Sequence, residues 1–190
     1  MSSSVSALLL MGGWAAWSAS FVFSKGAPAA PLKRDRRARW GILLQAVGYS
    51  LLWQNRFWER PVMLWRAGVS VLFLILASVF SWTAVRALGR HWRIDAALGA
   101  DHELVRTGPY RLVRHPIYTS MLYMLLATGL MLTPLPMLLV ALAVFIAGTE
   151  IRVRVEDALL ASHFGQQFRT YQRSVPAFFP FLNFALEKKS

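Results

Sequence analysis

Long apolar runs separated by short charged segments dominate the chain. Asp, Glu, Lys, Arg and His are all absent from four runs, 1–24, 40–55, 67–85 and 116–149. A helix needs about 20 apolar residues to cross a hydrocarbon core of about 30 Å, and most of these runs approach or exceed that length. The pattern therefore predicts membrane-spanning helices at about 5–23, 40–57, 62–88, 116–132 and 135–151.

The last apolar run and the segment after it carry their own signals. Pro134 and Pro136 lie too close together for one regular helix, so they predict a helical hairpin between the fourth and fifth spans. Beyond 151, apolar residues recur with the helical period, which predicts a C-terminal amphipathic segment over 152–184 with a break at Gly165. The predicted fold is a single all-α domain, residues 1–190: an integral membrane helical bundle of about five transmembrane helices with a cytosolic C-terminal amphipathic helix.

Composition and charge support a membrane protein and indicate its orientation. The 190 residues are 56% hydrophobic and only 16% charged, with a net charge of +12. Lys and Arg concentrate in 25–39, in 86–114 and after 151, which the positive-inside rule places in the cytosol with the N-terminus outside. Because these charges lie in loops between apolar runs, we expect membrane lipids rather than nucleic acid as their partners. The absence of cysteine excludes disulfides and thiolate metal sites, and no metal site is predicted.

The most polar internal stretch, 101–118, contains the candidate chemistry. Thr107-Gly108-Pro109 is a turn signal, because glycine tolerates positive φ and proline fixes its own. Pro116 suits the first turn of a helix, which places His115 at a helix N-terminus, where backbone N–H groups attract anions. The soluble nucleotide-binding and zinc-hydrolase motifs are absent, so a site here must be built in another way.

Two blocks of residues together carry a family resemblance. The first is Leu104-Val105, Gly108-Pro109-Tyr110, Arg114-His115-Pro116 and Tyr118; the second is Arg152, Glu156-Asp157, Phe164-Gly165, Tyr171 and Val175-Pro176. In this order they resemble the isoprenylcysteine carboxyl methyltransferase family and its phospholipid methyltransferase relatives, over roughly the C-terminal half of the chain. The family usually has two glutamates where this chain has Glu156-Asp157, and the shorter side chain places any role of Asp157 in more doubt than that of Glu156.

The resemblance implies a cofactor, S-adenosylmethionine, bound at the cytosolic membrane surface by the loop 89–115 and the residues around it. The cofactor-binding residues it implies are His102, Leu104, Val105, Gly108, Tyr110, His115, Tyr118 and Glu156. His115 suits the carboxylate of the cofactor and Glu156 its ammonium. Tyr110 and Tyr118 suit the sulfonium, while His102, Leu104 and Val105 suit the adenosine.

A catalytic role is implied for Arg152, since a guanidinium presents a fixed fork that can orient an acceptor. The simpler interpretation of Arg152 and Glu156 is an exposed i, i+4 ion pair of little energetic value. The acceptor stays open among an isoprenylcysteine-type carboxylate, an isoprenoid and a phospholipid, that is, a lipophilic or lipid-modified substrate.

Two other functions stay open at this stage. One is an NADPH-dependent, sterol-reductase-like membrane enzyme, whose terminal region contains a similar Gly-Pro-Tyr and Arg-His-Pro stretch. The other is a non-enzymatic membrane scaffold whose basic loops bind anionic lipid. The sequence does not indicate an oligomeric state.

Overall fold

The fold is almost entirely helical over the residues that the computed structural model describes, which are 2–24, 33–34, 37–53, 61–89, 97–98 and 104–179. Its elements are α1 (Ser3–Val22), α2 (Ala38–Ser50), α3 (Leu64–Leu88), the short 3₁₀ helix η3 (Gly108–Arg111), α4 (Pro116–Leu132), α5 (Leu135–Phe164) and α6 (Gln166–Ser174). Two short strands, β1 (Lys33–Arg34) and β2 (Ala97–Leu98), pair antiparallel.

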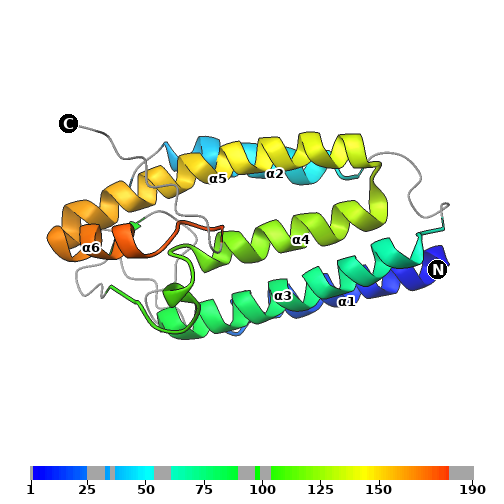
Figure 1. Cartoon of the computed structure of the whole chain (residues 1–190), viewed down its shortest axis with the longest axis horizontal. Helices are drawn as coiled ribbons and strands as arrows, with labels where there is room; N and C mark the ends of the chain where they lie inside the picture. The colour runs from blue at the N-terminus through cyan, green and yellow to red at the C-terminus, as the bar shows by residue number, and fades with distance from the viewer. Residues whose placement is uncertain are drawn as a thin grey trace.

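The long helices form two pairs with α4 between them (Figure 1). One apolar cluster joins α4 to α2 and α5 through residues such as Leu125, Leu138 and Phe145. A second cluster joins the opposite side of α4 to α1 and α3 through residues such as Leu74 and Met124. Helix α4 is therefore the central helix of the bundle, and its N-terminus lies at the same end of the molecule as α6 (Figure 1).

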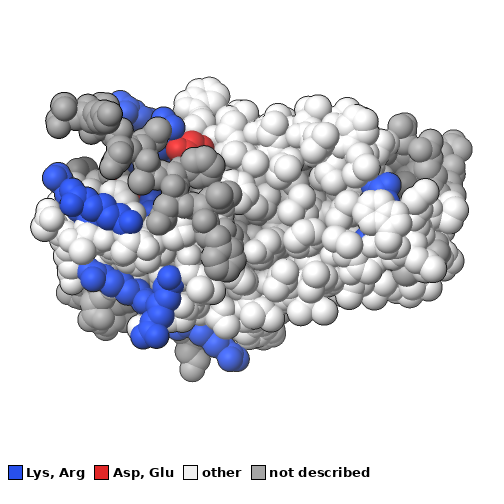
Figure 2. Space-filling model, in the orientation of Figure 1, with Lys and Arg blue, Asp and Glu red and all other residues white. Residues whose placement is uncertain are grey.

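Within the described part of the chain, three helices, α1, α3 and α5, are long and apolar enough to cross a membrane. Helix α4 is apolar but shorter, at 17 residues. The visible Lys and Arg side chains gather mainly at the α6 end of the molecule, next to a broad uncharged surface (Figure 2). These features are those of a helical membrane protein with one strongly basic end.

Helix α2 ends before the end of the span predicted over 40–57, of which residues 54–57 lie outside the described residues. It contains 13 residues, about 20 Å at 1.5 Å per residue, and ends at Ser50. The last turn tightens, with Leu52 N–H donating to Tyr49 O at 3.1 Å. The Leu52 carbonyl then accepts a hydrogen bond from the Thr133 hydroxyl at 2.7 Å, so the chain leaves the helix although its sequence is still apolar.

Helix α5 is longer than the span predicted over 135–151. It runs for 30 residues without a break, from Leu135 to Phe164. The amphipathic segment predicted to begin at 152 therefore continues α5 instead of starting a separate helix. Past Thr149, one face of the helix carries Glu156 and Asp157 against His115 at the start of α4, whereas Arg154 on another face is exposed. The expected break is present at Gly165, whose φ of 53° is unfavourable for other residues, and α6 follows it.

Helices α2 and α5 approach each other closely at glycines. A Cβ atom on Gly41 would lie 2.6 Å from the carbonyl oxygen of Gly148, and one on Gly148 would lie 2.7 Å from that of Gly41. Only glycine permits this backbone contact. It brings the side chains of α2 against the part of α5 where its charged residues begin.

Candidate active site

His115 caps the N-terminus of α4, with Pro116 in the first turn as expected. The chain that follows α6 lies across this helix end. The backbone N–H groups of Arg114 and His115 donate to the carbonyl oxygens of Pro176 and Ala177, both at 2.8 Å. The Thr119 hydroxyl also donates to Phe178 O at 2.7 Å. The segment 176–178 thus holds His115 in place, and the histidine is only 7% exposed.

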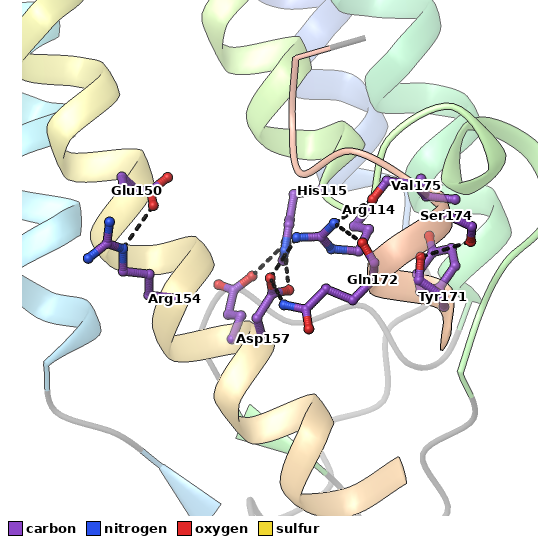
Figure 3. Close-up of polar contacts among 10 residues, drawn as sticks. Arg114, His115, Glu150, Arg154, Asp157, Tyr171, Gln172, Ser174 and Val175 are labelled. Atoms are coloured by element: carbon purple, nitrogen blue, oxygen red, sulfur yellow. Dashed lines mark hydrogen bonds and ion pairs between the residues drawn. The ribbon is translucent and has the colours of Figure 1, made fainter. Parts of the chain in front are cut away.

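The imidazole of His115 lies between the two acidic residues of α5. Its Nε2 is 2.9 Å from Asp157 Oδ1 and its Nδ1 is 3.3 Å from Glu156 Oε2. Figure 3 shows Asp157 directed from α5 toward His115, whereas the Glu150–Arg154 pair lies elsewhere along the helix. Carboxylates are favourable beside a helix N-terminus, so the acidic pair also complements the dipole of α4.

The acidic pair keeps His115 protonated. Burial alone lowers the pKa of the imidazole, but the hydrogen bonds to Asp157 and Glu156 outweigh it and raise the pKa from 6.5 to about 9. Burial raises the pKa of the Asp157 carboxyl, yet His115 and Arg114 overcome this effect and lower it from 3.8 to about 2. Burial likewise opposes ionisation of Glu156, whose pKa His115 nevertheless holds below 4.5. All three groups are therefore charged near neutral pH.

Arg114 completes the Asp157 side of the cluster. Its Nη2 lies 2.8 Å from Asp157 Oδ2, and both side chains are at most 10% exposed. Its Nη1 donates to the carbonyl oxygens of Gln172, at 3.1 Å, and Val175. Gln172 Nε2 also donates to Asp157 Oδ2 at 3.1 Å (Figure 3). Asp157 thereby ties α6 to the start of α4.

Arg152 occupies the Glu156 side of the cluster, one helical turn before that glutamate. Its Nη2 lies 3.5 Å from Glu156 Oε1, and its guanidinium carbon lies 4.8 Å from the centre of the Tyr118 ring. The Tyr118 hydroxyl donates to Glu156 Oε1, and the Tyr118 ring stacks with that of His115 at a centroid distance of 5.5 Å. Arg152 is only 8% exposed, so it does not form the exposed surface pair of the simpler interpretation.

The structure brings together four of the predicted site residues: His115, Tyr118, Arg152 and Glu156. Two of the others, Leu104 and Tyr110, contact the α6 region. Leu104 lies against the cluster of Phe168, Tyr171 and Val175, and the Tyr110 carbonyl accepts a hydrogen bond from the Tyr171 hydroxyl at 2.6 Å. Gly108 begins η3 with φ 59°, as its turn signal requires, and Val105 is half-buried beside it. His102 lies outside the described residues.

The geometry adds residues that the sequence analysis did not assign to the site. Asp157 has contacts with Arg114, His115 and Gln172, although its shorter side chain had made a role doubtful. The sequence feature that could have identified Asp157 is its position next to Glu156. Adjacent residues on a helix point about 100° apart, so two adjacent carboxylates can contact the two nitrogens of one imidazole. Gln45 of α2, which contacts Arg152, had no signal in the sequence.

Sequence comparisons identify the family. A profile of the phospholipid methyltransferase family matches residues 65–167, more than half of the chain and nearly all of the cluster just described. The chain belongs to this phospholipid methyltransferase family. The matched range contains both predicted blocks as far as Gly165, and the resemblance inferred from them is confirmed.

The curated relatives of this chain have names of two kinds. Several are isoprenylcysteine O-methyltransferases: one from Tribolium castaneum is 31% identical over 121 residues, which are 62% of this chain and 43% of the relative. Another is methyltransferase B of Arabidopsis thaliana, 30% identical over 122 residues, which are 63% of this chain and 61% of the relative. The chain thus spans less than two thirds of the length of both enzymes.

The other kind of name refers to metal resistance. The cobalt-zinc-cadmium resistance protein CzcN of Cupriavidus metallidurans is 34% identical over 153 residues, which are 80% of this chain and 67% of the relative. Among the described residues of the present family member, no group of three or more His, Cys, Asp and Glu residues is arranged to hold a metal ion.

Proposed function

We propose that the protein transfers a methyl group from S-adenosylmethionine to a lipophilic acceptor at the cytosolic membrane surface. The observation that carries the proposal is the buried cluster of Arg114, His115, Arg152, Glu156 and Asp157, at the basic end of a membrane protein from a methyltransferase family. In this proposal the C-terminus and the cluster face the cytosol, the N-terminus faces outward, and the bundle crosses the membrane about five times, with α2 and α4 as the shorter segments.

The donor set of the cluster fits the cofactor. The cofactor has a carboxylate, an ammonium and a sulfonium; when bound, it supplies an electrophilic methyl group. His115 carries a positive charge suited to the carboxylate, and Glu156 a negative charge suited to the ammonium. The Tyr118 ring already lies within 4.8 Å of one cation, Arg152, and such a ring surface is suited to a sulfonium.

The charge of the cluster favours an anionic acceptor. Three cations, Arg114, His115 and Arg152, face two anions, Glu156 and Asp157, which leaves one positive charge in a buried site. A carboxylate would be attracted to it, whereas an ammonium headgroup would be repelled. Among the acceptors left open by the sequence, we therefore favour a lipid-linked carboxylate, with Arg152 orienting its oxygen atoms.

Calorimetry on the detergent-purified protein tests the cofactor half of the proposal. S-adenosylhomocysteine should bind saturably, and His115→Ala and Glu156→Ala should each weaken binding about tenfold or more, the loss of a charge-assisted contact. Glu150→Gln is the matched control, because its carboxylate forms an exposed pair with Arg154 on the same helix. Binding of NADPH alone would indicate a reductase, and binding of neither ligand to folded protein would indicate a scaffold.

A further inference from the structure

Gln45 is a buried polar residue that the family profile does not include. It lies in α2, outside the matched range 65–167, and is only 3% exposed. Its Oε1 accepts a hydrogen bond from Arg152 Nη1 at 3.3 Å, and its Nε2 donates to Thr149 Oγ1 at 2.9 Å. Both ends of the amide are therefore engaged by α5.

An amide at this position needs its partners. Burying a polar side chain between apolar helices is unfavourable unless its hydrogen bonds are made, and an apolar residue would fill the same space without that cost. Thr149 is fully buried, so the contact with Nε2 is protected from water. Because a guanidinium can only donate hydrogen bonds, the amide presents its oxygen atom to Arg152 and its Nε2 to Thr149.

The close approach of α2 and α5 makes this contact possible. Gly41 lies one helical turn before Gln45, and a Cβ atom there would lie 2.5 Å from Arg152 Cγ. The backbone of α2 thus lies directly against the stem of Arg152. The head of Arg152 is then bounded by Gln45, by the ring of Tyr118 and by Glu156.

We propose that Gln45 is a positioning residue that sets the orientation of the Arg152 guanidinium and so determines the preference for a carboxylate acceptor. This inference rests on the proposed function, because it assigns to Arg152 the contact with the acceptor. A neutral amide is suited to this task, since it accepts a hydrogen bond from the guanidinium without neutralising its charge. The single excess positive charge of the cluster is therefore unchanged and can attract an incoming carboxylate.

The test compares Gln45→Leu, Gln45→Glu and Thr149→Val with the wild type, using N-acetyl-S-farnesylcysteine as the acceptor probe. Gln45→Leu should raise KM for the probe about tenfold or more, since a hydrogen bond to a charged group is lost, and leave the Kd for S-adenosylhomocysteine within about twofold. Gln45→Glu keeps an oxygen atom beside Arg152, so it should fold as well as the wild type but bind the probe no more tightly than its uncharged amide analogue, whose affinity is measured as a competitive inhibitor. Thr149→Val should also raise the KM for the probe, but by less than Gln45→Leu.

Thr128→Val provides the matched control. Thr128 is another fully buried hydroxyl, which accepts a hydrogen bond from Trp14 Nε1 in the opposite half of the bundle. Its replacement removes this contact and the hydrogen bond from its hydroxyl to Met124 O without touching Arg152. It should change the melting temperature but not the KM for the probe.

A second measurement does not depend on the choice of acceptor. In protein labelled with ¹⁵N in its arginine side chains, the Arg152 signal, assigned by Arg152→Lys, should show a rigid guanidinium in the wild type and a mobile one in Gln45→Leu. An unchanged signal, an unchanged KM, or an equal loss of probe and S-adenosylhomocysteine binding would each overturn the inference. A wild type that binds no S-adenosylhomocysteine would instead overturn the proposed function.

Discussion

At the scale of the residue, the site depends on one histidine held between two carboxylates. His115 receives Asp157 on one nitrogen and Glu156 on the other, and Arg114 approaches Asp157 from the opposite side. In a buried cluster each charge is stable only while its partners are present. Two predictions follow from the balance between these charges.

Replacement of Asp157 by asparagine should destabilise the protein strongly. The variant leaves Arg114 buried without its anion and His115 with one carboxylate fewer, and breaking a buried ion pair from one side costs about 3–5 kcal/mol. Thermal unfolding in detergent, followed by tryptophan fluorescence, measures the loss. Glu150→Gln should change stability by less than about 1 kcal/mol, because that glutamate is 43% exposed. Equal effects of the two variants would mean that the buried cluster contributes no more than a surface pair.

The pH dependence of stability should report the titration of His115. Its pKa is about 9 in the folded protein and about 6.5 when unfolded, so its contribution is fully present below 6.5 and is lost as the pH rises through 9. This rise in the pKa of His115 corresponds to roughly 3 kcal/mol of unfolding free energy, because a pKa change of one is worth about 1.4 kcal/mol. The contribution of Asp157 to stability depends on pH in the opposite direction: it is present above pH 3.8 and is lost as the pH falls through 2.

The comparison of wild type with His115→Gln isolates this effect. The difference between their melting temperatures should be largest near pH 5 to 6 and should shrink steadily toward pH 9, since both carboxylates are ionised throughout that range. A difference that stays constant from pH 5 to pH 9 would show that folding does not shift the pKa of His115.

Residues with a strong local signal could be predicted from the sequence, whereas residues defined by distant contacts could not. Pro116 marks a helix start, and this placed His115 correctly at the N-terminus of α4. Gln45 lies 107 positions from Arg152 and is surrounded by apolar residues, so no local pattern connects the two. Asp157 is intermediate, because its position beside Glu156 was visible but its distance to Arg114 depended on the packing of α4 against α5.

At the scale of the element, α2 and α5 depend on glycine at their contact. The backbones touch where Gly41 faces Gly148, and the adjacent Gln45 and Arg152 interact only because the helices are this close. The length of an apolar run predicts a helix but not where the helix stops. Helix α2 ends at Ser50, although the sequence around it is uncharged. Packing contacts such as that of Thr133 with Leu52 decide the end.

Gly148→Ala should therefore separate α2 from α5. The added Cβ would lie 2.7 Å from Gly41 O and 2.9 Å from Gln45 N, which are backbone atoms and cannot move without the helix. The expected loss is about 1–3 kcal/mol, the usual effect of overpacking, measured by thermal unfolding. Gly68→Ala is the control, because a Cβ there meets nothing within 4 Å. If both variants melt like the wild type, the glycine contact does not determine helix spacing.

At the scale of the whole molecule, the basic end defines a side of the membrane. The visible cationic side chains gather mainly at the α6 end, while the turn between α4 and α5 lies at the opposite end (Figures 1 and 2). The chain has no cysteine, so a single introduced one labels a known position.

Arg169→Cys in α6 should react with a membrane-impermeant maleimide only in inside-out vesicles, because the positive-inside rule places α6 in the cytosol. Leu135→Cys at the start of α5 should react only in right-side-out vesicles, and Leu135 is 49% exposed. The reverse result would invert the proposed orientation. Labelling of both positions from one side would mean that α5 does not cross the membrane.

The unbroken length of α5 also makes bilayer thickness a variable in the proposed methyl transfer. Helix α5 extends for about 45 Å and α4 for about 26 Å, at 1.5 Å per residue, so one is longer and the other shorter than a hydrocarbon core of about 30 Å. A change in lipid thickness alters the tilt of the two helices by different amounts. Since α4 carries His115 and α5 carries its two carboxylates, we expect acyl chain length to tune the site, with fastest turnover at one matching thickness.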